Sequence, residues 1–202
     1  MDALGTIFGS EARVRIIRLF LFNTEIFFDI NTISSKSKVN KRILKREIST
    51  LLKSGLLKEK DISKVIQNKR GKSRKVKIHT YYLNQGFAYI TALKQLLIKT
   101  KMIDGGEIVR RLSKSGKLKL VIIAGVFTQD KDSRADMLVV GNNISKSALT
   151  NAVKSIEAEL GCELVYVYFE TPDYQYRLGM YDKLVRDILD YPHHILLDKI
   201  SL

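Results

Sequence analysis

The sequence has little of several residue types that define whole classes of protein. Its 202 residues include one cysteine, Cys162, which excludes an internal disulfide and a zinc site built on several thiolates. A cysteine content this low fits a reducing, cytoplasmic environment. Two prolines and 12 glycines exclude a collagen-like or low-complexity chain. Long apolar runs are missing too, so we expect no signal segment and no membrane span, although 45% apolar residues suffice for a core.

Acidic residues are scarce in the first half of the chain only. Residues 1–100 contain 21 Lys and Arg against 7 Asp and Glu, whereas residues 101–202 contain 14 of each. The net charge of +14 therefore belongs to the first half. This segregation predicts one domain that meets an anion and another with a different task. We expect a first domain over 1–85, a helical linker or dimerisation region over 86–116, and a second domain over 117–202.

The first domain contains a helix whose exposed face is basic. Apolar residues recur with helical spacing after Asn40, a candidate N-cap, and the pattern ends at Gly55. Four cations lie near the start of this helix, where the helix dipole disfavours positive charge: Lys41, Arg42, Lys45 and Arg46. Unfavourable charge at the end that would enter a groove indicates contact with phosphates and bases. A solvated basic face is the alternative interpretation.

The next segment, residues 56–83, is typical of two strands around a polar tip. Residues 58–77 contain nine Lys and Arg against two acids, Glu59 and Asp61, and Gly71 lies in the tip. Lysine also keeps strand edges from pairing, so a basic hairpin alone is not specific. Combined with the basic helix, it predicts double-stranded DNA as the partner. The candidate DNA-binding residues are Asn40, Lys41, Arg42, Lys45, Arg46, Lys69, Arg70, Lys72, Arg74 and Lys75.

Three segments of this half carry a family resemblance. They are Gly-Ser-Glu-Ala-Arg-Val-Arg-Ile-Ile-Arg-Leu-Phe at 9–20, Ile-Asn-Thr-Ile at 30–33, and Ile-Leu-Lys-Arg-Glu-Ile-Ser-Thr-Leu-Leu-Lys-Ser-Gly-Leu-Leu at 43–57. Residues 7–83 resemble the ArsR-like winged helix-turn-helix transcription regulators. The resemblance implies a dimeric, duplex-DNA-binding regulator of bacterial or archaeal type. Some members sense metals through Cys or His clusters, which this sequence lacks, since Cys162 is distant and His79 stands alone in the hairpin.

The apolar stripes of residues 86–115 fit either domain packing or a dimer seam. A homodimer is favoured, because two such domains would read two half-sites. Beyond them, strands alternate with helices, so we expect a mixed α+β chain. The expected strands cover 117–128, 136–141, 163–169 and 195–197, and the expected helices cover 144–160 and 174–189.

Two motifs of the second half carry another resemblance: Ala-Gly-Val-Phe at 124–127 and Ser-Arg-Ala-Asp-Met-Leu at 133–138. They are similar to motifs of the small nucleotidyltransferase domains that occur fused to winged helices. Active members hold phosphates on a Gly-Ser turn and two Mg²⁺ ions on paired carboxylates. Gly125 and Asp136 match this pattern. Val126 stands in the serine position and Arg134 in that of the first carboxylate.

A cation in place of a metal-binding carboxylate does not suit a two-metal site. Val165 also stands where the third carboxylate of the family is expected. The sequence therefore predicts a small α/β nucleotidyltransferase-like domain that is not an enzyme, with no metal and no cofactor. Gly125, Arg134 and Asp136 are the candidate vestigial ligand site, in which Arg134 pairs with Asp136 or binds an anionic ligand.

These features predict a cytoplasmic transcription regulator. Its first domain grips DNA, and its second dimerises or senses a small-molecule or protein effector. Two other functions stay open: a divergent Mg-dependent nucleotidyltransferase acting on or near nucleic acid, and an antitoxin-like protein-interaction module. A membrane partner is not expected, because the sequence has no basic amphipathic anchor.

Overall fold

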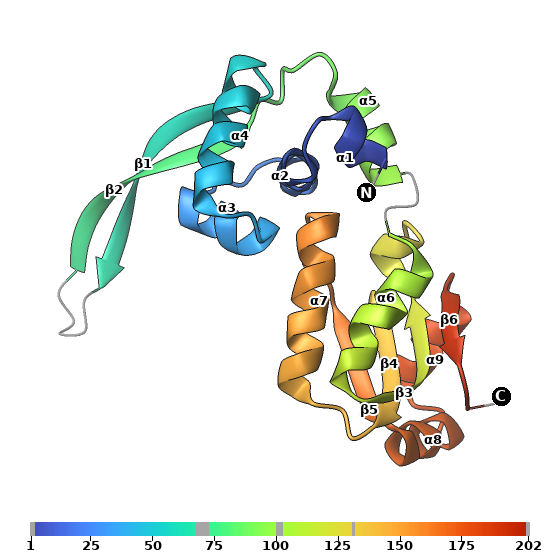
Figure 1. The fold of residues 1–202 in the computed structure, drawn as a ribbon. Helices are drawn as coiled ribbons and strands as arrows, with labels where there is room; N and C mark the ends of the chain where they lie inside the picture. The colour runs from blue at the N-terminus through green and yellow to red at the C-terminus, as the bar shows by residue number, and fades with distance from the viewer. Residues whose placement is uncertain (1–2, 68–72, 100–102, 131, 201–202) are drawn as a thin grey trace. The chain divides into compact units, whose positions relative to one another are not determined.

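A computed structural model gives the fold and describes residues 3–67, 73–99, 103–130 and 132–200. The chain is mixed α+β, which confirms the expected class (Figure 1). It divides into two compact units: unit 1 comprises Met1–Thr100 and Ala158–Cys162, and unit 2 comprises Lys101–Glu157 and Glu163–Leu202. Residues 86–116 are therefore shared between the units. None of the helices in the described ranges is long and apolar enough to cross a membrane.

Unit 1 begins with helices that start at capping side chains. A short helix, α1 (Ala3–Ile7), precedes α2 (Glu11–Phe22), α3 (Ile30–Ser37) and α4 (Lys41–Lys53). The side chains of Ser10, Asp29 and Asn40 accept hydrogen bonds from the first free backbone N–H groups of α2, α3 and α4, respectively. Gly55 follows α4 with φ +78°, a left-handed conformation that favours glycine, and its N–H donates to the carbonyl of Leu52.

A two-stranded hairpin follows these helices. Strands β1 (Leu57–Gln67) and β2 (Ser73–Leu83) pair antiparallel from Leu57–Leu83 to Gln67–Ser73. In Figure 1 the hairpin extends away from the helices of unit 1. At its base, Phe28 forms an isolated antiparallel bridge with Tyr81, so the connection between α2 and α3 adds one rung to the sheet.

The core of unit 1 takes side chains from all of these elements. Helix α5 (Ile90–Lys94) and the π-helical turn Gln95–Lys99 pack against it as well, with Leu97 fully buried. Phe87, Ile90, Leu93 and Leu97 of the apolar stripe thus pack within unit 1, whereas Leu96 is exposed. The largest buried apolar side chains of this core are Ile16, Phe20, Ile33, Leu44, Leu57, Leu83 and Leu97.

Unit 2 is built on a four-stranded sheet of order β5-β4-β3-β6. Strands β3 (Lys117–Ile123), β4 (Met137–Asn142) and β6 (His194–Asp198) pair antiparallel, and β5 (Tyr166–Glu170) runs parallel to β4. Helix α7 (Lys146–Leu160) makes the crossover that a parallel β4–β5 pair requires. The remaining helices are α6 (Gly105–Leu112), α8 (Thr171–Gly179) and α9 (Lys183–Asp190).

The two central strands are buried from Leu120 to Ile123 in β3 and from Met137 to Gly141 in β4, because both of their faces are covered there. On one face, Leu120 and Leu138 pack with Tyr174 of α8 and with Val185 and Ile188 of α9. Helices α6 and α7 lie on the viewer's side of the sheet in Figure 1.

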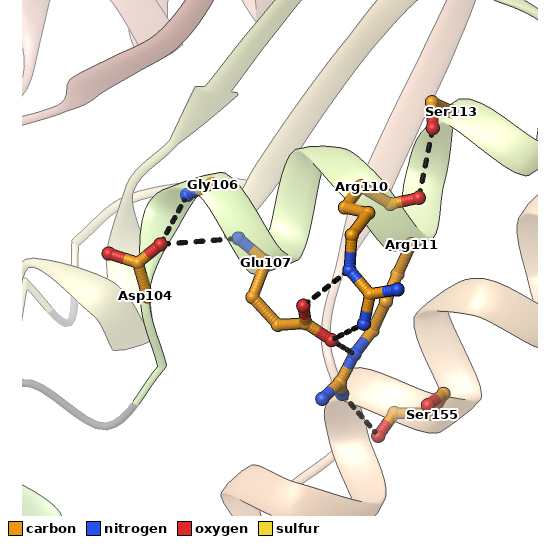
Figure 2. A network of polar contacts seen from close by, with 7 residues as sticks. All are labelled: Asp104, Gly106, Glu107, Arg110, Arg111, Ser113 and Ser155. Atoms are coloured by element: carbon orange, nitrogen blue, oxygen red, sulfur yellow. Dashed lines mark hydrogen bonds and ion pairs between the residues drawn. The ribbon is translucent and has the colours of Figure 1, made fainter.

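Helix α6 is held by a network of polar contacts (Figure 2). Asp104 caps it by accepting from the N–H groups of Gly106 and Glu107. The Glu107 carboxylate accepts from Arg110 at 2.7 and 2.8 Å and from Arg111 at 2.7 Å, and these bonds lower the pKa of Glu107 to about 2. Arg111 also donates to the carbonyl of Ser155 at 3.4 Å, which ties α6 to α7.

Three expected boundaries in unit 2 are wrong. β3 ends at Ile123 instead of 128, because the chain turns at Gly125 with φ +53°. β5 begins at Tyr166 instead of 163. The expected helix over 174–189 is two helices, because Tyr181 takes φ +54° and Asp182 caps α9.

Candidate nucleic-acid interface

Helix α4 presents its cations to solvent and turns its one acid inward. Glu47 is 1% exposed, and its Oε2 accepts from Nε of Arg13 at 2.8 Å. Arg13 also donates from Nη1 to the carbonyl of Phe8 at 2.8 Å, which fixes its guanidinium against α4. All four predicted cations of α4 are exposed, and the side chain of Arg46 is 79% exposed. Every exposed charged side chain of α4 is therefore a cation.

Asn40 has a structural role at the start of this surface. Its Oδ1 accepts from the N–H of Arg42 at 2.8 Å, so it fixes where α4 begins. The cations at 41, 42, 45 and 46 follow within the first two turns. Within the described ranges, Lys41, Arg42 and Lys45 have no ion-pair partner, whereas Arg46 approaches Glu47 at 3.7 Å.

The two acids of the hairpin are paired with neighbours on the same face. The register places Asp61 opposite His79, and their Oδ1 and Nδ1 atoms lie 2.8 Å apart. Nε2 of His79 lies 3.2 Å from Oε2 of Glu59, and Nζ of Lys77 lies 2.9 Å from Oδ2 of Asp61. His79, which the sequence leaves isolated, is thus the centre of a small ionic cluster.

These contacts shift the pKa values of His79 and Asp61 in opposite directions. The hydrogen bond with Asp61, followed by that with Glu59, raises the pKa of His79 above its ordinary 6.5. The hydrogen bond with Lys77, followed by that with His79, lowers the pKa of Asp61 below its ordinary 3.8. Asp61 is therefore ionised over the whole neutral range, and its charge is matched within the cluster.

The opposite face of the hairpin carries lysines without acids. Successive strand residues point to opposite faces, and cross-strand partners share a face. Lys58 is opposite Tyr82, and Lys60 is opposite Thr80; both lysines are exposed. In the part of the hairpin that the structure describes, both acids thus lie on one face, and Lys58 and Lys60 lie on the other.

The other predicted hairpin residues are described to different extents. Lys75 is exposed and opposite Val65. The backbone of Arg74 pairs with Ile66, and its side chain lies outside the described part. Lys69, Arg70 and Lys72 lie outside the described residues altogether, as does Gly71, so their contacts with DNA stay predictions.

In unit 2, Gly125 and Asp136 lie together, but the chain itself occupies the carboxylate. Oδ1 of Asp136 accepts from the N–H of Val126 at 2.8 Å, and Oδ2 accepts from the N–H of Val165 at 2.8 Å. Asp136 is 9% exposed. A Cβ atom on Gly125 would collide with Oδ1 of Asp136, so this close approach requires glycine.

Arg134 lies apart from this pair. Its Nε forms an ion pair with Oδ2 of Asp187 in α9, so the pairing with Asp136 that the sequence offered is wrong. The side chain of Val165 is 60% exposed, and only its backbone reaches Asp136. These residues do not fit a pair of Mg²⁺ ions, because both Asp136 oxygens hold backbone N–H groups and Arg134 stands in the position of the first carboxylate. Among the described residues, no three His, Cys, Asp or Glu side chains converge as metal ligands.

Sequence reasoning missed the Arg13–Glu47 pair. A signal for it exists, since Glu47 falls within the inward stripe of α4 between Leu44 and Ile48. An acid at such a position needs a buried partner.

The comparisons with known proteins add no family: no protein-family model matches the chain, and no curated protein or solved structure matches it significantly.

Proposed function

We propose that the protein is a DNA-binding transcription regulator whose unit 1 is a winged helix. Helix α4 lies in the major groove, and the β1–β2 hairpin lies along the sugar-phosphate backbone. One observation carries this proposal: the solvent face of α4 is cationic because Glu47, its one acid, is buried against Arg13. A helix selected for stability alone would expose an acid near its N-terminus, whereas phosphates compensate four cations there.

The order of elements in unit 1 supports the same proposal. Helices α2, α3 and α4 are followed by a hairpin, and the Phe28–Tyr81 bridge adds a rung between α2 and α3. This is the order of a winged helix-turn-helix. In the ionic cluster around His79, Lys77 and the protonated form of His79 offset the repulsion that Glu59 and Asp61 would otherwise exert on a phosphate backbone.

The proposal assigns unit 2 a non-catalytic role. A nucleotidyltransferase-like domain without paired carboxylates serves dimerisation or sensing, and a cytoplasmic homodimer presents two copies of α4 to two half-sites. The test is turnover of ATP in the presence of Mg²⁺. Turnover that Asp136→Ala abolishes, in a variant that stays folded, would establish an enzyme instead.

Binding of duplex DNA tests the role of α4. Each phosphate contact contributes about 0.9 to the slope of log K against log salt concentration. The double variant Lys45→Gln/Arg46→Gln should bind more weakly and lower this slope by roughly 1 to 2. Lys146→Gln, an exposed lysine at the start of α7, is the matched control and should leave the slope unchanged.

Selection of bound fragments from a random duplex pool tests base recognition. Arg42→Ala or Arg46→Ala should change the preferred sequence, because base contacts specify while phosphate contacts position. Equal weakening on every sequence would remove the base-reading role. An unchanged salt slope in Lys45→Gln/Arg46→Gln would remove α4 from the interface altogether.

A further inference from the structure

A second group of cations surrounds a cavity in unit 2, although this half of the sequence is neutral. The cavity has a volume of about 420 Å³ and lies between α6, the start of β3 and the end of β6. Three lysines line it: Lys117, Lys119 and Lys199. Its apolar wall consists of Val109, Leu118 and Leu197. A concave site lined by one sign of charge concentrates its field inside the cavity.

These lysines differ from the other cations of unit 2. All five arginines of residues 101–202 form ion pairs with acids of unit 2: Arg110, Arg111, Arg134, Arg177 and Arg186. Within the described ranges, by contrast, none of the three cavity lysines has an acidic partner. Asp198 is adjacent in sequence, but its Oδ1 accepts from the N–H of Ile200. The cavity therefore holds uncompensated positive charge.

The C-terminal end of α6 offsets only part of this charge. The cavity includes Val109 and Ser113, which belong to the last turn and C-cap of α6. The end of a helix is equivalent to about −0.5 of an elementary charge, whereas three lysines carry three positive charges. Most of the positive charge of the three lysines is therefore not compensated by the helix end.

A bulge in β3 adds Leu118 to the lining of the cavity beside Lys117 and Lys119. In a regular strand, Leu118 would point to the face opposite Lys117 and Lys119. The register of β3 against β4 shifts between Leu118 and Leu120, and all three residues 117–119 line the cavity. The N–H of Lys199 donates to the carbonyl of Lys119 at 2.7 Å, which holds the third lysine beside this bulge. Bulges of this kind redirect side chains at functional sites.

The cavity is distinct from the Gly125–Asp136 turn. It lies at the Lys117 end of β3, whereas Gly125 follows the opposite end of the same strand. Six steps of about 3.3 Å separate the two ends of β3, a distance of roughly 20 Å.

We propose that this cavity binds a small organic anion, with the three lysines around a phosphate or carboxylate group and the apolar wall against the rest of the molecule. The site is independent of the proposed DNA contacts of unit 1. It gives unit 2 a ligand, and it names the chemical class of that ligand.

The test is a titration of the isotope-labelled full chain, followed by amide signals in two-dimensional NMR at constant ionic strength. The probes are phenyl phosphate, benzoate and inorganic phosphate. We expect saturable shifts at residues 109–119 and 197–199. At least one aromatic anion should bind at least ten-fold more tightly than inorganic phosphate, and comparison of phenyl phosphate with benzoate identifies the preferred anionic group.

The double variant Lys119→Gln/Lys199→Gln should weaken this binding at least ten-fold, while Lys146→Gln changes it less than two-fold. If the spectrum of the double variant shows loss of fold, the two single variants replace it, and each should weaken binding. Shifts confined to residues 1–100, or equal affinity in wild type and variants, would overturn the proposal. Equal affinity for inorganic phosphate and the aromatic anions would show that the apolar wall does not contribute to binding.

Discussion

Replacement of Asp136 by alanine tests whether this residue is structural. Its carboxylate accepts one backbone hydrogen bond from the turn after β3 and one from the segment before β5, each at 2.8 Å. Asp136 therefore joins three parts of unit 2 at one point. Asp136→Ala leaves the N–H groups of Val126 and Val165 without acceptors at a site that is 9% exposed.

The expected loss of stability follows from these two hydrogen bonds. A hydrogen bond to a charged group contributes about 1.5–3 kcal/mol, so Asp136→Ala should lower the free energy of unfolding of unit 2 by roughly 3–6 kcal/mol. Asp136→Asn keeps one acceptor, now uncharged, and turns an N–H₂ group toward the other donor, so we expect at least half of that loss. With a urea slope of about 1–3 kcal/mol per molar, the midpoint should fall by at least about 1 M for alanine.

Urea unfolding followed by the amide signals of β3 and β4 measures this loss within unit 2. Asp190→Asn is the matched control, because Asp190 forms an exposed pair with Arg186 at 3.4 Å. Exposed pairs contribute about 0–1 kcal/mol, so this midpoint should hardly move. A loss below about 1 kcal/mol for Asp136→Ala would refute the structural role.

Gly125 sharpens the test. Gly125→Ala meets a backbone with φ +53° and a collision with Oδ1 of Asp136. The collision disappears in the Asp136→Ala background, so the double variant should be more stable than the two single losses predict when added. Strict additivity would show that the two residues do not act through each other.

Three more predictions concern buried or paired groups. Tyr174→Phe should leave the stability of unit 2 unchanged or raise it by up to about 1 kcal/mol, seen as an unchanged or higher thermal midpoint, because the buried Tyr174 hydroxyl has no hydrogen-bond partner among the described residues. Glu47→Gln should lower the free energy of unfolding of unit 1, measured in urea, by about 3 kcal/mol, since the guanidinium of Arg13, which is only 29% exposed, loses its acidic partner. His79 should show a pKa above 6.5 by NMR, and Asp61→Asn should lower that pKa. The stabilisation that protonated His79 contributes is complete below pH 6.5 and disappears as the pH rises through the raised pKa.

Local signals predicted the limits of helix α4 well. Asn40 caps α4 as expected, and Gly55 follows the helix in a left-handed conformation. Caps and apolar stripes act within one or two turns, so the sequence alone contains them.

Boundaries that depend on tertiary contacts were not predictable in this way. The apolar run after Lys117 continues past Ile123, but the strand stops because Asp136, eleven residues beyond Gly125, binds the next turn. The apolar pattern also continues through Tyr181, where the backbone separates α8 from α9.

The candidate site shows the same division. The cations of α4 and of the hairpin are visible in the sequence, whereas the partners of the acids depend on register and packing. Asp61 meets His79 only because the strands pair with that register. Glu47 meets Arg13 across 34 positions of sequence.

The two-stranded sheet of unit 1 has a consequence for the solubility of the protein. Among the described residues, only Tyr81 receives an added rung, so these strands of 11 residues leave long runs of backbone N–H and C=O groups on both outer edges. Such edges pair with other chains unless charge keeps them apart, and Lys58, Lys60, Lys75 and Lys77 are exposed along these strands. Neutralising them should therefore promote edge-to-edge self-association, which light scattering detects as a concentration-dependent rise in particle size.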